Sequence, residues 1–212
     1  MTSTFITPFI YLASQSPRRA ELLAQLGVAH RLLLADETED AESLEAVRGA
    51  EAPATYVQRV TRLKLDAAVA RAQKRGLWTK QDASPILCAD TTVAMGRTIY
   101  GKPDTARAAG QMLETLAGKT HRVLTSVGVA WRSGRQVKTS FALSESRVTF
   151  VPLSKAEIAA YIATNEPFGK AGSYGVQGKA AAFISKISGS YSGIMGLPLH
   201  ETAGLLRAAK MR

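Results

Sequence analysis

An apolar segment near the beginning of the chain, residues 9–14, is followed directly by Ser-Pro-Arg-Arg at residues 16–19. Pro17 suits the first position of a helix, because its φ is already helical and its missing N–H needs no partner there. Ser16 is a favourable N-cap residue, and Gly27 favours the end of the same helix. The sequence therefore predicts a strand over residues 9–14, followed by a helix that begins at Pro17.

Two cations lie at the start of this predicted helix, where the helix dipole favours anions. Arg18 and Arg19 would be stabilised there by a bound anion, because free backbone N–H groups and two guanidinium forks together suit a phosphate chain. The alternative is an ordinary capped helix with two solvated arginines. The residues of this segment alone do not favour either reading.

The chain has 212 residues and a formal net charge of +10, which favours an anionic partner such as a nucleotide or a nucleic acid. Much of the positive charge is spread through predicted helices, and this favours solvated helix faces over a nucleic-acid groove. Cys88 is the only cysteine, so an internal disulfide and a cysteine-based zinc site are excluded. With no signal peptide and no apolar run of membrane-spanning length, we expect a cytoplasmic protein that does not engage the membrane.

Strand and helix signals alternate along the whole chain. Apolar and β-branched runs predict strands over residues 9–14, 30–34, 85–89, 121–131 and 138–151, and a hairpin around Gly96. Capping residues and helical spacing predict helices over 17–26, 53–75, 104–117, 154–163 and 201–210, with Asp104 as one N-cap and Ser154 with Glu157 as a capping box. No linker or repeat divides the chain, so we expect one domain over residues 1–212. Its fold class is α/β, with a mixed, twisted central sheet flanked by helices and two lobes around a cleft.

The glycine-rich stretch over residues 165–200 is different. Its seven glycines indicate close backbone approach to a ligand, although a loop-rich edge would have the same composition.

Two acidic positions are candidates for catalysis. Asp90 follows the predicted strand 85–89 directly, and open α/β sheets bind ligands at the carboxyl ends of their strands. A carboxylate there could hold a divalent cation and orient or deprotonate a water molecule. Glu39 belongs to an acidic loop, which suits a phosphate site only if a metal ion bridges carboxylate and phosphate oxygens. The alternatives are a turn-forming aspartate and a solvated acidic loop.

Two lysines are candidates for binding phosphate. Lys64 borders the apolar face of the predicted helix 53–75, and Lys102 lies in a Gly-Lys-Pro turn. A Walker-type glycine loop is absent, which excludes a P-loop enzyme. The three histidines lack metal-ligand spacing and are interpreted as structural.

Several segments, in this order, resemble the Maf family of nucleoside triphosphate pyrophosphatases. They read LASQSPRRAELLAQLG, YVQRVTRLK, CADTTV, GKP, LAGKTHRVLTSV, KAGSYGVQG and GSYSGIMGLPLHET. The resemblance implies hydrolysis of a nucleoside triphosphate to the monophosphate and pyrophosphate by a cytoplasmic hydrolase acting on phosphoanhydrides. It also implies help from Mg²⁺ or Mn²⁺ and a homodimer.

The resemblance also implies roles for individual residues. Asp90 would be the catalytic base, Glu39 would bind metal with it, and Lys64 and Lys102 would complete the catalytic set. Counting without gaps from residues 16–19 assigns the glutamate to Glu39, and a small shift would make it Glu37. The residues expected to hold the substrate are Ser14, Arg18, Arg19, Thr91 and Gln177.

At Arg18, Thr91 and Gln177 the chain resembles the branch of the family that acts on dTTP and UTP. The Gln177 amide could form hydrogen bonds with a pyrimidine edge as both donor and acceptor. Gly169 stands where the family commonly has an aspartate. The predicted function is therefore metal-assisted hydrolysis of dTTP and UTP. The alternatives are a pyrophosphatase for purine triphosphates such as ITP and a non-enzymatic regulator that binds nucleic acid.

Overall fold

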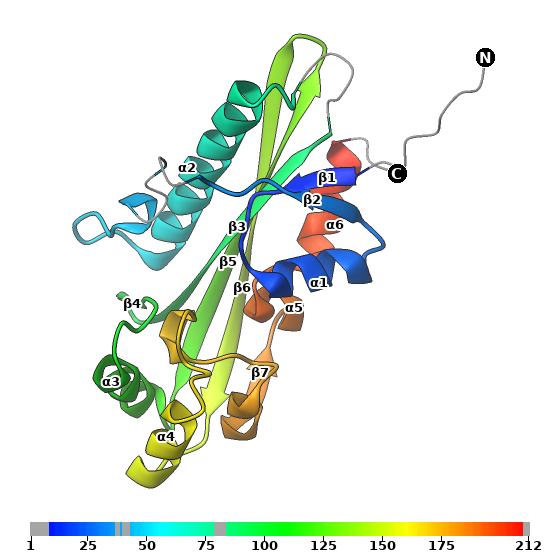
Figure 1. Ribbon diagram of the computed structural model, residues 1–212. Coiled ribbons are helices and arrows are strands. Elements are labelled where there is room, and N and C mark those ends of the chain that lie inside the picture. Colours follow the sequence, from blue (N-terminus) through cyan, green and yellow to red (C-terminus); the bar gives the residue numbers. More distant parts are fainter. Residues whose placement is uncertain (1–8, 37–38, 40–42, 79–83, 210–212) are drawn as a thin grey trace.

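The computed structural model describes residues 9–36, 39, 43–78 and 84–209. Its central feature is a seven-stranded mixed sheet, in which strands run in the order β2-β1-β3-β5-β6-β7 and β4 pairs with β3. The strands are β1 (Phe9–Leu12), β2 (Ala29–Leu32), β3 (Ile86–Met95), β4 (Thr98–Tyr100), β5 (Thr120–Ser133), β6 (Gln136–Phe150) and β7 (Ile184–Ser188). The predicted α/β class is confirmed, because helices flank this twisted mixed sheet (Figure 1).

The helices connect and cover these strands. They are α1 (Pro17–Gln25), α2 (Pro53–Lys74), α3 (Ala106–Leu116), α4 (Lys155–Ile162), α5 (Tyr191–Met195) and α6 (Leu199–Ala208), with 3₁₀ segments η1 (Ser43–Glu45), η2 (Ala171–Ser173) and η3 (Lys179–Phe183). Within the described residues no helix is both long and apolar enough to cross a bilayer.

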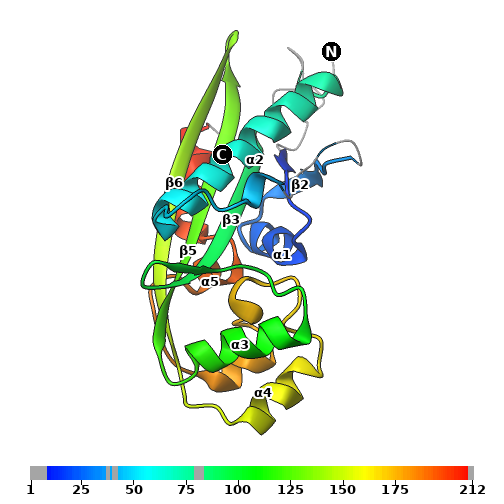
Figure 2. The ribbon, with the colours of Figure 1, turned by 90° about the vertical axis from the view of Figure 1, so that its left-hand side faces the viewer.

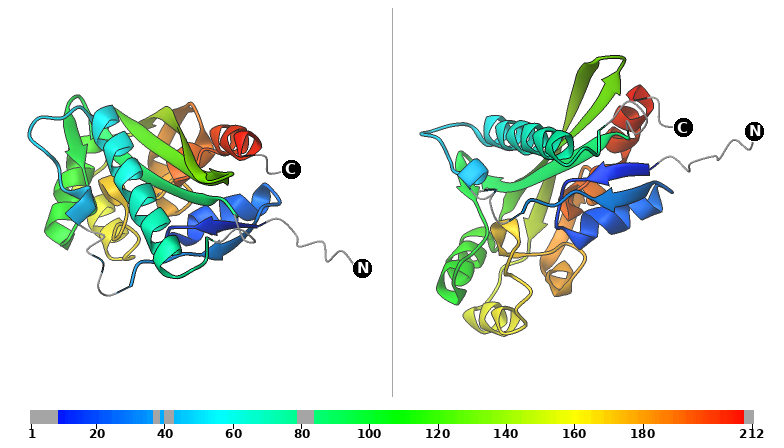
Figure 3. Two further views of the ribbon diagram at one scale, coloured as in Figure 1. Left: turned by 90° about the horizontal axis from the view of Figure 1, so that it is seen from above. Right: turned by 45° about the horizontal axis from the view of Figure 1, so that its top comes forward.

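Three long strands, β3, β5 and β6, run through the molecule, and the helices lie in two groups near their two ends (Figure 1). Near one end, α2 and α6 lie on opposite sides of these strands (Figure 3, left). Near the other end lie α3 and α4 (Figure 2). Separate apolar clusters support the two groups: one contains Leu22, Leu23 and Leu205, and another contains Leu113, Phe150 and Tyr174. This arrangement gives the two lobes that the sequence predicted.

The open edge of β3 determines where a ligand can approach the sheet. β1 pairs in parallel with β3 only at Ile86 and Leu87, and β4 joins the same edge only from Val93 onward. Between these pairings, residues 88–92 of β3 have a strand partner on the β5 side alone, among the residues that the structure describes. Asp90 lies in the middle of this open interval.

This corrects the expectation that a strand ends at Ala89. Asp90, Thr91 and Thr92 look like a turn in the sequence, but each pairs with a residue of β5, and β3 continues to Met95. The long antiparallel partner therefore overrides the local turn signal, because cross-strand pairing and burial decide strand formation more than intrinsic propensity.

Helix starts test the capping predictions. The capping box of Ser154 and Glu157 is confirmed at the start of α4. The N-cap of α3 is Thr105, whose side chain accepts a hydrogen bond from the Ala108 N–H, so the expectation that Asp104 caps this helix is wrong. Ser16 occupies the N-cap position of α1, but its side chain makes no capping hydrogen bond.

The glycine-rich stretch over residues 165–200 folds into short elements, from η2 to the start of α6. Gly172 has a φ of +67° and lies so close to β3 that an added Cβ would be 2.8 Å from a methyl carbon of Val93. By contrast, Gly169, Gly175 and Gly196 line a cavity. Close backbone approach is therefore seen in packing at Gly172, and approach to a ligand stays a prediction for the three glycines at the cavity.

Candidate active site

A cavity of about 560 Å³ opens beside the unpaired interval of β3. Both lobes line it: the start of α1, the middle of α2 and β3 from one side, and the segment over residues 169–177 from the other. Six basic side chains and two acidic ones face it, namely Arg18, Arg19, Lys64, Arg71, Lys102, Lys170, Asp90 and Glu45. The excess of positive charge favours a polyanionic ligand.

A chain of ion pairs forms the centre of this cavity. Asp90 Oδ1 accepts a hydrogen bond from Lys64 Nζ at 2.6 Å, and the same ammonium group donates to Glu45 Oε1 at 2.7 Å. Lys102 Nζ donates to Glu45 Oε2 at 3.0 Å and to Oε1 at 3.2 Å. Three predicted residues, Asp90, Lys64 and Lys102, therefore lie together, and Glu45 joins them.

The electrostatics of this group follow from its pairing. Burial lowers the pKa of Lys64, but the carboxylates of Asp90 and Glu45 outweigh burial and hold that pKa above its ordinary value. Burial raises the pKa of Glu45, but the ammonium groups of Lys64 and Lys102 outweigh it, so the pKa lies below its ordinary value. Both Lys64 and Glu45 are therefore charged at neutral pH.

Glu39 does not join this group of ion pairs but pairs with Arg71, which lines the same cavity. Arg71 Nε donates to Glu39 Oε1 at 2.7 Å, and Arg71 Nη2 donates to Glu39 Oε2 at 2.6 Å. The third Arg71 nitrogen donates to the carbonyl of Leu33 at 2.8 Å. The hydrogen bonds from Arg71 hold the pKa of Glu39 below its usual range. Both oxygens of Glu39 are thus occupied by a buried guanidinium, and Glu45 is the glutamate that contacts Lys64. Glu37 lies outside the described residues.

The start of α1 contributes a hydroxyl and two guanidinium groups. Arg19 Nη1 donates to Ser14 Oγ at 2.9 Å, and Ser16 N donates to the same oxygen at 3.2 Å. Because Ser14 Oγ already accepts two hydrogen bonds, its own proton is available to a ligand. Arg19 Nε donates to the carbonyl of Gly196 at 2.8 Å, and burial lowers the pKa of its guanidinium. Arg18 lines the cavity with no hydrogen bond or ion pair to another described residue.

Thr91 is held by a chain of hydroxyls. Thr125 Oγ1 donates to the carbonyl of Gly193 at 2.7 Å and lies 2.9 Å from Thr91 Oγ1. Since a hydroxyl has one proton, Thr125 must accept from Thr91. The free lone pairs of Thr91 can therefore only accept hydrogen bonds, which suits a donor on the ligand better than a phosphate oxygen.

Gln177 lies on the opposite wall of the cavity. It is exposed and belongs to a turn in which Gly178 N donates to the carbonyl of Gly175 at 3.0 Å. The buried residues Tyr174 and Val176 anchor this turn in the adjacent apolar cluster. The cavity thus brings Ser14, Arg18, Arg19, Thr91 and Gln177 to one space with Asp90.

The acidic side chains suit a hard cation. Among the described residues there is no group of three or more histidines, cysteines, aspartates and glutamates that could hold a metal by themselves. Asp90 and Glu45 both line the cavity and share Lys64, and Oδ2 of Asp90 accepts from no described residue. Mg²⁺ is commonly bound by one or two carboxylates together with phosphate oxygens of a substrate, so this donor set fits such an ion.

The sequence profile described as "Maf-like protein" matches residues 9–209. The chain belongs to the Maf family. A protein of Polaromonas named "dTTP/UTP pyrophosphatase" is 60% identical over 204 residues, which are 96% of this chain and 97% of that protein. A protein of Albidiferax ferrireducens with the same name is 60% identical over 203 residues, covering 96% and 98%. The solved structure of the Staphylococcus aureus Ham1 protein matches with a TM-score of 0.33 at 13% identity over 70% of this chain and 88% of that one, a likeness too low to bear on function.

Sequence reasoning missed three residues of this Maf-family cavity: Glu45, Arg71 and Lys170. Glu45 lies three residues beyond the acidic loop that drew attention to Glu39, in a one-turn segment without periodicity. Arg71 looked like one of several solvated arginines of α2, but its side chain is only 7% exposed. Its place on the buried face of α2 was the one available signal, because a charged residue there needs a partner.

Proposed function

We propose that this Maf-family chain hydrolyses dTTP and UTP to the monophosphate and pyrophosphate. The observation that carries the proposal is a buried carboxylate, Asp90, paired with Lys64 at the open edge of a strand and faced by an excess of cations. The names of relatives that are 60% identical over almost the whole chain support the same activity and the pyrimidine substrates.

The triphosphate binds, in this proposal, at the start of α1. Ser16 N donates to Ser14 Oγ and Arg19 N donates to the Ser16 carbonyl, so the free proton of Ser14 and the fork of Arg18 are the donors beside the phosphates. Arg19 donates one hydrogen bond to the Gly196 carbonyl and one to Ser14 Oγ. It thereby fixes the position of Ser14 and adds positive charge beside the phosphates. A phosphate chain here extends toward Lys64 and Lys102 along the cavity.

Asp90 then acts on water. Lys64 holds its Oδ1, and no described residue donates to Oδ2, which leaves that oxygen available to orient a water molecule and accept its proton. The water oxygen forms a bond to the α-phosphorus, and the bond from that phosphorus to the bridging oxygen breaks. Pyrophosphate leaves, and the cationic side chains stabilise the charge that develops on it.

A divalent cation, Mg²⁺ or Mn²⁺, belongs to the same proposal. Asp90 and Glu45 would hold it, in place of the pair Asp90 and Glu39 expected from the sequence, because Glu45 shares Lys64 with Asp90 whereas Glu39 pairs with Arg71. When bound, such an ion would neutralise phosphate charge and polarise a phosphoryl oxygen.

The pyrimidine preference is assigned to Gln177 and Thr91. The Gln177 amide offers one acceptor and two donors, while Thr91 accepts only, and a pyrimidine edge with carbonyl oxygens beside an N–H matches that set. A cytoplasmic homodimer is part of the proposal and rests on the family resemblance alone.

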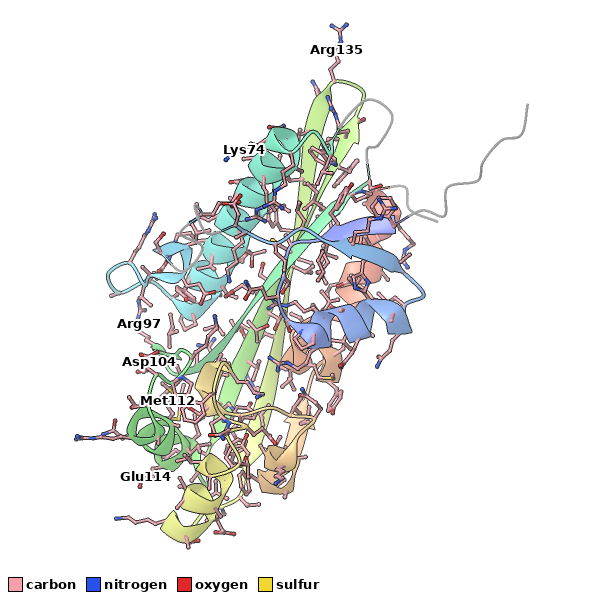
Figure 4. All side chains as sticks on the ribbon, viewed as in Figure 1. Lys74, Arg97, Asp104, Met112, Glu114 and Arg135 are labelled. Atoms are coloured by element: carbon pink, nitrogen blue, oxygen red, sulfur yellow. The ribbon has the colours of Figure 1, made fainter. Side chains whose placement is uncertain are left out.

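A panel of triphosphates with pyrophosphate detection tests the function. We expect pyrophosphate release from dTTP and UTP, with Asp90→Asn at least about 10²-fold slower in kcat. Preferential turnover of ITP would refute the substrate assignment. Absence of turnover together with steeply salt-dependent binding of DNA or RNA would refute the activity. The dispersed basic side chains argue against that last outcome: Lys74, Arg97 and Arg135 project from separate parts of the surface (Figure 4).

A further inference from the structure

The turn that carries Gln177 is held by the segment immediately before it in the chain. Glu166 lies four residues beyond the end of α4, and its side chain reaches the beginning of η3, just after the turn. Glu166 Oε2 accepts a hydrogen bond from Lys179 N at 2.9 Å, and Oε1 accepts from Ala180 N at 3.4 Å. The Tyr161 hydroxyl donates to Oε1 at 2.9 Å. Both carboxylate oxygens are therefore used to fix one flank of the turn.

Gly178 shows how closely the carboxylate lies against this turn. A Cβ added at Gly178 would be 2.2 Å from Glu166 Oε1 and 2.5 Å from its carboxyl carbon. No side chain fits between them, so the backbone of the turn rests directly on the carboxylate. A Cβ at this position would push the Glu166 carboxylate away from its three donors, so the close contact depends on a glycine here.

Lys170 holds the other flank. Its ammonium group donates to the backbone carbonyl of Glu166, and its stem packs so close to Gly175 that a Cβ there would be 3.2 Å from Lys170 Cε. The same Cβ would be 3.6 Å from Gln177 Oε1, so the amide of Gln177 folds back over this glycine. Glu166 therefore contacts the end of the turn 175–178 and Lys170 contacts its beginning, and Gln177 lies between these two contacts at the cavity.

We infer that Glu166 is a positioning residue for base recognition: it fixes the turn 175–178 and thereby holds the Gln177 amide against the pyrimidine edge of the substrate. This inference rests on the proposed function. Glu166 itself does not line the cavity among the described residues, so it acts through Gln177 and not on the reacting phosphate. A carboxylate suits this task because it accepts from all three donors at once, whereas an amide would point its NH₂ group at one of them.

The test is Glu166→Gln, measured as the ratio of kcat/KM for dTTP to kcat/KM for dATP. We expect the ratio to fall about tenfold, the loss of one hydrogen bond to the base. The change should appear in KM for dTTP, with kcat altered less than about threefold, because Asp90 and Lys64 are untouched. The matched control is Glu157→Gln, which removes a carboxylate that bonds only the capping residue Ser154 at the other end of α4. The ratio should be unchanged in the control.

A double-mutant cycle decides whether Glu166 acts through Gln177. In the Gln177→Ala background, Glu166→Gln should no longer change the ratio. An equal fall in both backgrounds, or a fall in kcat with KM unchanged, would overturn the inference. If Glu166→Gln does not fold, Tyr161→Phe removes one of the three donors and keeps the ring that packs edge-on against Phe183. The same cycle is then run with that variant.

Hydrogen exchange separates this inference from the proposed function. Amide exchange over residues 176–180 should accelerate in Glu166→Gln and stay unchanged in Glu157→Gln, whether or not dTTP is a substrate. Unchanged exchange in both variants would refute the positioning role. Accelerated exchange in a protein that releases no pyrophosphate from dTTP would instead refute the proposed function and leave Gln177 without a base to recognise.

Discussion

Replacing Glu39 and Glu45 one at a time should separate stability from turnover. Glu39→Gln removes the charge that faces Arg71, whose side chain is 7% exposed, and weakens two hydrogen bonds of 2.7 and 2.6 Å. Breaking a fully buried pair costs about 3–5 kcal/mol. The Glu39 side chain is 28% exposed, so water compensates in part, and we expect about 2 kcal/mol. For a domain of this size, that lowers Tm by about 4–8 °C.

Glu45→Gln should have the opposite profile. Glu45 is 31% exposed, its partner Lys102 is 55% exposed, and its other partner Lys64, 21% exposed, keeps its pair with Asp90, so the free energy of unfolding should change by less than about 1 kcal/mol. The loss of a carboxylate beside Asp90 and Lys64 should lower kcat for dTTP by about 10²-fold. Thermal denaturation and pyrophosphate release, measured on the same preparations at pH 7.5, provide both values. Glu145→Gln, which loses a 3.5 Å surface pair with Arg122, is the control and should change neither.

The pH dependence gives a further check on Glu39. Its pKa is lowered in the folded protein, so its stabilisation is present above the unfolded value of about 4.5 and is lost as the pH falls below that value. The Tm difference between the parent and Glu39→Gln should therefore shrink in acid. The reasoning would be refuted if Glu39→Gln kept the parent Tm and lost about 10²-fold in kcat, or if Glu45→Gln turned over dTTP at the parent rate.

Three other outcomes follow from the structure. Burial lowers the pKa of His121 to about 4, so on acidification the unfolded chain binds a proton at this residue before the folded protein does. The free energy of unfolding should therefore fall by up to about 3 kcal/mol between pH 6.5 and 4. Urea titrations at several pH values should show this fall in the parent, and His121→Phe should abolish it. Gly128→Ala should lower the free energy of unfolding by about 1–3 kcal/mol, because its Cβ would lie 2.7 Å from the Phe141 ring. A urea midpoint equal to that of the parent would contradict that packing. Removal of divalent cations by a chelator should abolish pyrophosphate release from dTTP, with recovery on adding Mg²⁺; undiminished release would count against a metal at Asp90 and Glu45.

Much of the fold could be predicted because local signals and tertiary structure agree. The proline at the start of α1 and the capping box of Ser154 and Glu157 act over a few residues, and both elements begin where expected. The continuation of β3 through Asp90 could not be predicted in this way. It depends on β5, in which Ser126 pairs with Asp90 from 36 positions farther along the chain.

The same distinction between local and tertiary signals applies to the residues of the candidate site. Motif residues such as Arg19, Lys64 and Asp90 carry a chemical signature in their neighbours, and the structure brings them to one cavity. The choice between Glu39 and Glu45 depends on tertiary contacts with Lys64 and Arg71 of α2, and no periodicity in the sequence records those contacts. Which carboxylate meets Lys64 and which meets Arg71 is therefore a property of the folded loop, since either glutamate could pair with either cation in the sequence alone.

The bond from Arg19 to the carbonyl of Gly196 joins positions 177 residues apart. During synthesis, Arg19, the residue proposed to stand beside the phosphates, has no such anchor until 177 further residues have been added. A nascent chain that stops before Gly196 lacks this anchor as well as α6, whose Leu205 belongs to the same apolar cluster as Leu22 and Leu23 of α1. The corner of the cavity formed by Ser14 and Arg19 therefore takes its final geometry only after Gly196 has been added, and we expect a product truncated before that residue to be inactive even if its first strands have already paired.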